Sequence, residues 1–160
     1  MTGPDKTPDP AAVEARLGHS FADRGLLAEA LTHSSAITDT ASYERLEFLG
    51  DRVLGLILAE YFHANCPADD EGKLSLRYHA AARQSTLAGV ARAIDIGPYV
   101  QTQAGMDLAA NDSVLSDVIE SLVAALYLDG GLDVVRRFVL ANWPLDAEAP
   151  ATGAKDAKSR

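Results

Sequence analysis

The sequence predicts an all-α fold, and three observations support this prediction. Apolar residues recur at spacings of three and four through most of the chain, as they do on the buried face of a helix. Runs of β-branched residues are few, and no alternating stretch is long enough for a strand. Prolines, glycines and capping residues stand at the ends of the periodic segments. A length of 160 residues is enough for one domain with a substantial core.

The first three helices can be placed by their end signals. Pro10 suits a first helical turn and Gly18 a stop, while Asp23 can cap a second helix. A long third helix follows Ser42 and ends before Pro67, because the residue that precedes a proline disfavours the α conformation. The expected spans of these helices are 11–17, 24–31 and 43–65.

The last three helices follow an acidic turn at residues 68–72. The fourth is expected to run without interruption until Gly97 and Pro98 close it. Asp112 can cap the fifth, which stops at the glycine pair 130–131, and Asp133 opens the last. The expected spans of these helices are 74–94, 113–128 and 133–142.

The two ends of the chain differ in composition from its centre. Residues 1–9 contain prolines and a glycine without an apolar pattern, so we expect a flexible tail. Residues 146–160 are rich in Ala, Pro, Gly and charge, which is the composition of a linker. The folded unit is therefore expected to span residues 10–145.

Charge and cysteine content exclude several classes of protein. A net charge of −9 and a pI near 4.7 argue against binding nucleic acid by bulk electrostatics alone. The single cysteine, Cys66, excludes a disulfide framework and, with only four scattered histidines, a standard structural zinc site. The longest apolar run, residues 53–59, is too short for a membrane helix, and the opening residues do not resemble a signal peptide. We expect a cytoplasmic protein.

The predicted third helix carries an unusual stripe of acids. Glu44, Glu47 and Asp51 lie within about 60° of arc, because successive helical residues are about 100° apart. Acids on a helix normally face solvent. Here the rest of the helix is apolar nearly all round, which is typical of a central buried helix. We therefore expect these carboxylates to enter a crowded site.

The predicted fifth helix repeats this arrangement with Asp117 and Glu120 one turn apart. The small residues Ser113, Ser121 and Ala124 share their side of the helix and would allow another helix or a substrate to approach. Carboxylates gathered in a partly dry site repel one another unless a cation offsets their charge. Oxygen ligands without histidine or cysteine suit Mg²⁺ or Mn²⁺. Metal-assisted hydrolysis of a phosphodiester is the chemistry that fits this set best.

Four blocks of the sequence resemble the ribonuclease III family. Residues 43–54 read YERLEFLGDRVL, which is similar to the family signature. The blocks LTHSS (31–35), EGKLS (71–75) and the helix of residues 113–131, which ends in YLDGG, resemble other family segments in the expected order. The resemblance covers nearly all of residues 11–143.

This resemblance implies an all-α, dimeric endonuclease domain that cuts double-stranded RNA with Mg²⁺, for which Mn²⁺ can substitute. It implies products with 5′-phosphate and 3′-hydroxyl ends and a role in rRNA and mRNA processing. It also implies a C-terminal double-stranded RNA-binding domain, and residues 155–160 resemble the first residues of such a domain. By motif position, the metal ligands are Glu47, Asp51, Asp117 and Glu120, of which Asp51 and Glu120 are also catalytic. Further acids of the cleavage valley are Glu44 and Glu71. The aromatic residue that packs into the partner subunit is Phe48.

Several other residues allow two interpretations. His33 precedes the signature helix and is either a structural hydrogen-bonding residue or a contact for substrate. Tyr78 stands where the family more often has a basic residue, and Arg77 or Arg83 could substitute for it in contacting RNA. Arg52 faces away from the acid stripe and is expected to pair with a neighbouring acid or with the partner subunit.

Two alternative functions compete with the nuclease. A non-catalytic, RNA-binding scaffold of the same fold should have lost some of the acids, and all six are present. An all-α nucleotide pyrophosphohydrolase would carry an ExxE pair followed by ExxD. This chain carries ExxExxxD followed by DxxE.

Overall fold

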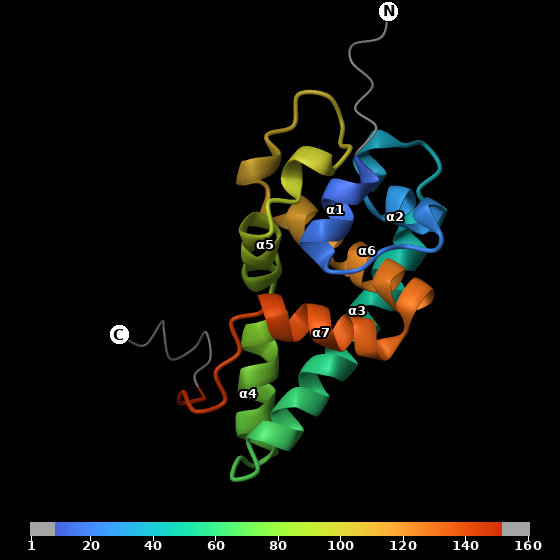
Figure 1. Cartoon of the computed structure of the whole chain (residues 1–160). Coiled ribbons are helices and arrows are strands. Elements are labelled where there is room, and N and C mark those ends of the chain that lie inside the picture. The colour runs from blue at the N-terminus through green and yellow to red at the C-terminus, as the bar shows by residue number, and fades with distance from the viewer. Residues whose placement is uncertain (1–8, 152–160) are drawn as a thin grey trace, which may run out of the picture.

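The structure is a computed structural model that describes residues 9–151, and it confirms the all-α prediction (Figure 1). Within that range the β structure is a single isolated bridge between Thr32 and Gln101. Three 3₁₀ turns lie at Ser34–Ala36, Gly97–Tyr99 and Leu108–Ala110. The α-helices are α1 (Pro10–Leu17), α2 (Arg24–Ala30), α3 (Ala41–Asn65), α4 (Glu71–Ala82), α5 (Gln84–Ala93), α6 (Asp112–Gly130) and α7 (Leu132–Asn142).

The helix α6 forms the centre of the core. Most of its residues are buried, and Val118, Ile119 and Leu122 are fully enclosed. The helices α2, α3, α5 and α7 all pack against it. The most extensive of these contacts is with α3, which crosses α6 and then extends downward beside α4 (Figure 1).

The backbones of α3 and α6 meet at Gly50. This glycine is buried, and a Cβ atom built on it would lie 1.7 Å from the backbone oxygen of Glu120. No side chain fits in that space, so glycine at this position sets how closely the two helices approach. The contact fixes which residues of α3 face which residues of α6.

Five of the six predicted helices are confirmed to within two residues at each end. Pro10 occupies the first turn of α1, and Gly18 ends that helix in the left-handed conformation at φ 72°. The predicted cap of α6 was wrong. The Asn111 side chain, rather than that of Asp112, accepts a hydrogen bond from the amide of Val114 at 3.0 Å.

The prediction of one continuous fourth helix over residues 74–94 was wrong, because the structure has two helices there, α4 and α5. Arg83 is extended (ψ 155°) between them, and the two halves pack on different partners, α4 on α3 and α5 on α6. Carbonyl groups at the end of α4 accept hydrogen bonds from side chains instead of from helical amides. The Thr86 hydroxyl donates to the Ala80 oxygen at 2.7 Å, and the Trp143 indole donates to the Ala81 oxygen at 3.0 Å. Tertiary packing therefore compensates for the helical hydrogen bonds lost at the break.

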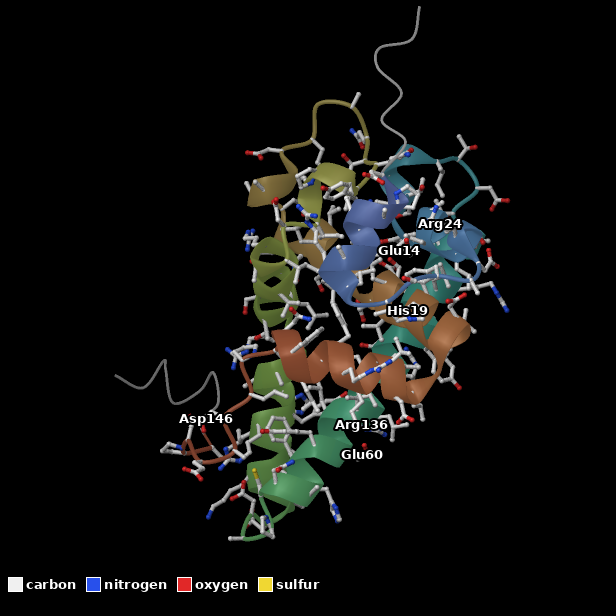
Figure 2. All side chains as sticks on the ribbon, viewed as in Figure 1. Glu14, His19, Arg24, Glu60, Arg136 and Asp146 are labelled. Atoms are coloured by element: carbon white, nitrogen blue, oxygen red, sulfur yellow. The ribbon has the colours of Figure 1, made fainter. Side chains whose placement is uncertain are left out.

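Polar contacts join the outer elements to their neighbours (Figure 2). Glu14 of α1 accepts hydrogen bonds from the Phe21 amide and from Arg24. Near the other end of α3, Arg136 of α7 pairs with Glu60 at 2.9 Å. These contacts join α1 to the start of α2 and α7 to α3.

The first part of the predicted linker lies against α4. Arg77 pairs with Asp69 and donates hydrogen bonds to the carbonyl oxygens of Asp146 and Ala149. Residues 1–8 of the predicted tail (1–9), residues 152–160 of the predicted linker (146–160) and the expected start of an RNA-binding domain lie outside the described residues. Among the helices of residues 9–151, none has both the length and the hydropathy required to cross a membrane.

We predict that Gly50→Ala destabilises the fold by about 3 kcal/mol or more, because the added methyl group must force α3 and α6 apart. Gly89→Ala is the matched control, since Gly89 lies inside the helix α5 with nothing within 4 Å of its Cβ position. It should stabilise by about 0.5–1 kcal/mol. Urea unfolding of both variants measures these changes, and wild-type stability in Gly50→Ala would show that the close approach is not required.

Candidate active site

Four of the six predicted acids converge where α3 crosses α6. Glu47 and Asp51 stand on either side of Gly50 in α3, and Glu120 is the residue of α6 that meets this glycine. Asp117 lies one turn before Glu120, on the same side of α6. The close approach of the two backbones thus brings four carboxylates together from two helices.

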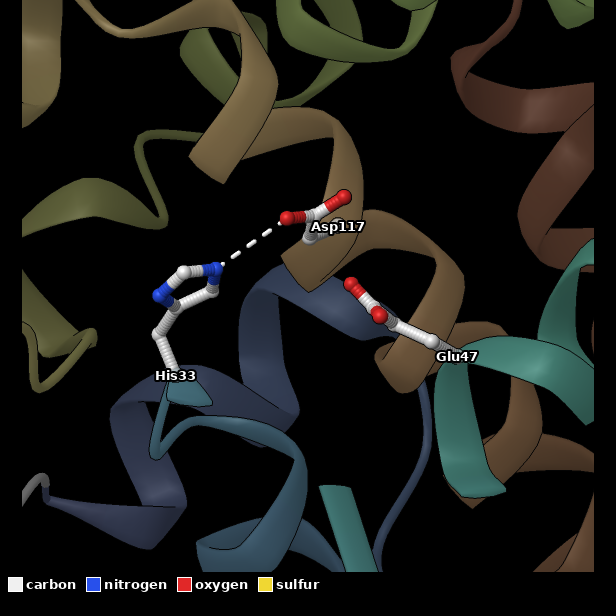
Figure 3. Close-up of side chains that lie close together, drawn as sticks. All are labelled: His33, Glu47 and Asp117. Atoms are coloured by element: carbon white, nitrogen blue, oxygen red, sulfur yellow. Dashed lines mark hydrogen bonds and ion pairs between the residues drawn. The ribbon is translucent and has the colours of Figure 1, made fainter. Parts of the chain in front are cut away.

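Glu47 and Asp117 form the best-defined part of this cluster together with His33 (Figure 3). One oxygen of each carboxylate and one ring nitrogen of His33 all lie within 4.8 Å of one another. The His33 Nε2 atom is 3.1 Å from Asp117 Oδ2. The Asp117 side chain is 33% exposed, so the cluster is open to solvent on one side.

Two of the acids have raised pKa values. Burial, followed by the charge of Asp117 and a hydrogen bond with it, raises the pKa of Glu47 from 4.5 to about 7. Burial, followed by a hydrogen bond with Asp51 and the charges of Asp51, Glu47 and Asp117, raises the pKa of Glu120 from 4.5 to about 8. Each of these two carboxyls therefore titrates under the influence of its neighbours rather than independently.

The donor set fits a hard divalent cation. Carboxylate oxygens at the cluster are the ligands that Mg²⁺ and Mn²⁺ prefer, and a cation would offset both the burial and the repulsion that raise the pKa of Glu47 and Glu120. The Tyr43 hydroxyl is buried nearby and, among the described residues, has no hydrogen-bond partner. Burial, assisted by the charges of Glu47, Asp117 and Glu120, raises the pKa of this hydroxyl, so it stays protonated as a donor.

The two further acids lie in different places. Glu44, in the first turn of α3, contributes to the raised pKa of Glu47 and accepts a hydrogen bond from the Thr40 hydroxyl at 2.9 Å. Glu71 begins α4 and accepts a hydrogen bond from Ser75 at 2.9 Å. The part of α3 that follows Asp51 spans about 21 Å before α4 begins. Glu71 therefore lies far from the cluster of its own chain.

Phe48 is exposed beside the acid cluster. Its side chain is 61% exposed, unusually high for phenylalanine, and it lines a groove of about 800 Å³ together with Leu49 and Leu128. The Arg52 guanidinium lies over the Phe48 ring, 3.8 Å from its centroid, and pairs with Asp51 at 3.3 Å. Arg52 therefore pairs with a neighbouring acid as expected, but this acid belongs to the stripe from which Arg52 was expected to face away.

The three residues of the predicted fourth helix that were considered for RNA contact have different surroundings in the structure. The Tyr78 hydroxyl lies over Gly55, 2.7 Å from where a Cβ of that residue would be. Arg77 is occupied by Asp69 and the chain after α7. Arg83 stands at the break between α4 and α5.

The sequence indicated a hydrogen-bonding role for His33 but not its partner. Asp117 is 84 residues away in the chain, so no local spacing could pair the two. In the structure His33 is buried and forms a hydrogen bond with Asp117, one of the predicted metal ligands.

Comparison with known proteins identifies relatives along nearly the whole chain. The sequence model of a family described as Ribonuclease-III-like matches residues 23–144. Ribonuclease 3 of Rhodopseudomonas palustris is 44% identical over 155 residues, which cover 93% of this chain and 57% of that protein. Ribonuclease 3 of Rhizobium etli is also 44% identical, over 94% of this chain and 65% of that protein. The chain thus spans about three fifths of the length of these relatives.

Solved structures give the same result. Two structures of the nuclease domain of ribonuclease III from Campylobacter jejuni superpose with a TM-score of 0.77. One is 31% identical and covers 84% of this chain and 98% of that domain, and it is described for structural flexibility in a region involved in dimer formation. The other is 30% identical and covers 87% of this chain and 99% of that domain.

We predict that the metal-free protein loses stability as the pH rises through about 7 and 8. The folded-state pKa values of Glu47 and Glu120 exceed the ordinary value of 4.5, so the folded state retains protons that the unfolded state has released. This contribution to stability is complete below pH 4.5 and is lost above the raised values.

Melting curves with and without Mg²⁺ measure this effect. Mg²⁺ at millimolar concentration should raise the Tm most at alkaline pH and should raise it less in Asp51→Asn. Without metal, Glu120→Gln should be more stable than wild type at alkaline pH. Identical pH dependence in the wild type and this variant, or a Tm indifferent to Mg²⁺, would contradict the coupled cluster.

Proposed function

The chain belongs to the ribonuclease III family, and from this premise we propose that it is an endonuclease that hydrolyses phosphodiester bonds of double-stranded RNA. The proposed cofactor is Mg²⁺, with Mn²⁺ as a substitute, and the proposed products carry 5′-phosphate and 3′-hydroxyl ends. The observation that carries the proposal is the convergence of Glu47, Asp51, Asp117 and Glu120 at the crossing of α3 and α6.

These four carboxylates would hold the metal. Bound Mg²⁺ would lower the pKa of a coordinated water and offset charge on the phosphate. Glu120 is proposed to be catalytic because of its motif position and because it lies at the contact with Gly50, beside the carboxylates that would hold the metal. Asp51, its hydrogen-bonding neighbour, is proposed to act with it. Glu47 and Asp117 complete the ligand set, and Glu44 is assigned an outer role through its effect on Glu47.

We assign the exposed face around Phe48 to a homodimer. A duplex presents two antiparallel strands related by local two-fold symmetry, and a C2 dimer can offer one acid cluster to each. Phe48, Leu49 and Leu128 supply apolar surface and a groove next to those acids. Glu71, which is remote from the acids of its own chain, is proposed to contribute to the wider cleavage valley of such an assembly.

The charge of the chain bears on how it would hold RNA. A net charge of −9 provides little general attraction for RNA phosphates. We therefore retain the proposal that residues 146–160 lead towards a double-stranded RNA-binding domain, which would supply positive surface. A cytoplasmic location and a role in rRNA and mRNA processing are proposed from the family relationship.

Glu120→Gln should reduce cleavage of duplex RNA by several orders of magnitude while the fold is retained. The amide preserves the size of the side chain but removes one anionic ligand. Glu60→Gln is a control on α3, because Glu60 pairs with Arg136 away from the cluster. Cleavage of labelled duplex RNA in Mg²⁺ compares the two variants, and a wild-type rate in Glu120→Gln would exclude its catalytic role.

Phe48→Asp should yield inactive monomers, because a dimer would have to bury a charged carboxylate at the contact in place of an apolar ring. Leu140→Asp is the matched control: Leu140 is 52% exposed on α7, and its replacement should leave the dimer intact. Light scattering reports the mass of each variant. A stable dimer of Phe48→Asp would place the interface elsewhere.

A further inference from the structure

We propose that His33 is a positioning residue for Asp117: it donates a hydrogen bond from Nε2 to this metal ligand, and the backbone of its own turn fixes the ring in the required tautomer. The inference rests on the proposed function for the identity of Asp117 as a ligand. His33 is not one of the acids of the cluster. Its proposed role predicts that its replacement lowers the affinity of the site for metal.

The backbone of His33 is fixed on both sides. Its amide donates to the Gln101 oxygen at 2.9 Å, and the Gln101 amide donates to the Leu31 oxygen at 2.8 Å, which forms the isolated bridge. The His33 oxygen accepts from the Ala36 amide at 2.9 Å and so closes the following 3₁₀ turn. The backbone of His33 is therefore held on one side by the segment around Gln101 and on the other by its own turn.

The tautomer follows from the donors around the ring. The Ser35 amide points its hydrogen at His33 Nδ1, at 3.1 Å. An amide can only donate, so Nδ1 must be the accepting nitrogen and carries no proton. Ser35 Oγ, 2.9 Å from Nδ1, accepts from the Gln103 amide and can donate its own hydrogen to the ring. In the neutral ring the proton is therefore on Nε2.

The protonated nitrogen is the one that meets Asp117. Nε2 lies 3.1 Å from Asp117 Oδ2, so the N–H group donates to the carboxylate (Figure 3). His33 is only 6% exposed, and its ring packs edge-on against Tyr43 with 5.3 Å between centroids. Asp117 is held from this buried side and remains partly exposed on the other. Such a contact selects one rotamer of the carboxylate before any ligand arrives.

Direct ligation of metal by His33 is the competing explanation, because its nitrogen lies within 4.8 Å of both Glu47 and Asp117 oxygens. Ligation through Nε2 would need a lone pair on that atom and hence a proton on Nδ1. That proton would face the Ser35 N–H group, donor against donor. Oxygen ligands are also the ones that Mg²⁺ prefers. The geometry thus favours positioning over ligation.

Two variants separate positioning from support of the turn. His33→Asn retains an acceptor for the Ser35 amide but is too short to donate to Asp117, whereas His33→Gln can place an N–H group near the Nε2 position. Calorimetric titration of the RNA-free protein with Mn²⁺ provides the readout. We expect affinity to fall about 10–100-fold in His33→Asn and to stay near wild type in His33→Gln. Wild-type affinity in His33→Asn, with affinity lost in His33→Gln, would overturn the proposal.

The tautomer can be observed directly. Long-range ¹H–¹⁵N spectra of the wild-type protein, recorded above the ordinary pKa of histidine, should show a proton on Nε2 and none on Nδ1, with and without Mg²⁺. A proton on Nδ1 would overturn the proposal, as would loss of the Nε2 proton on addition of Mg²⁺.

These measurements also distinguish this inference from the proposed function. If the wild type binds Mn²⁺ with the expected dependence on residue 33 but does not cleave duplex RNA, positioning stands and the proposed nuclease function fails. If the wild type binds no Mn²⁺ at all, the positioning role is overturned. Cleavage with unchanged Mn²⁺ affinity in both variants would support the nuclease and reject the role of His33.

Discussion

The contact between Gly50 and the backbone of Glu120 is the constraint on which the site depends. A Cβ at Gly50 would lie 1.7 Å from the Glu120 oxygen, so the two helices can approach this closely only because residue 50 has no side chain. Glu47 and Asp51 flank the contact on α3, while Glu120 and Asp117 face them from α6. The contact that packs α3 against α6 in the core therefore also brings the acids of the cluster together.

Burial of α6 in the core has an electrostatic cost, because it also buries acidic side chains. The apolar surface of α6 drives it into the core, and the acids on one side of that helix are carried into a partly buried site. The raised pKa values of Glu47 and Glu120 record the resulting cost of ionisation. A divalent cation would remove much of that cost, which explains why metal binding and stability should be coupled. His33 adds order by holding one of the acids from the buried side.

Local sequence patterns were sufficient for the features that arise within one helix. The stripe containing Glu47 and the pair ending in Glu120 follow from helical periodicity, which does not depend on the rest of the fold. The break at Arg83 was missed because neither proline nor glycine marks it, and the packing of its two halves on different helices decides it. Likewise, the hydrogen bond of His33 to Asp117 joins residues that are 84 positions apart, so no local pattern could predict it.

Anomalous diffraction from crystals of the RNA-free protein grown with Mn²⁺ tests the central claim most directly. The account predicts manganese density at the crossing of α3 and α6, coordinated by carboxylate oxygens of Glu47, Asp51, Asp117 and Glu120 and not by His33 nitrogen. Manganese bound only elsewhere, or absence of anomalous density at this crossing at saturating Mn²⁺, would contradict it.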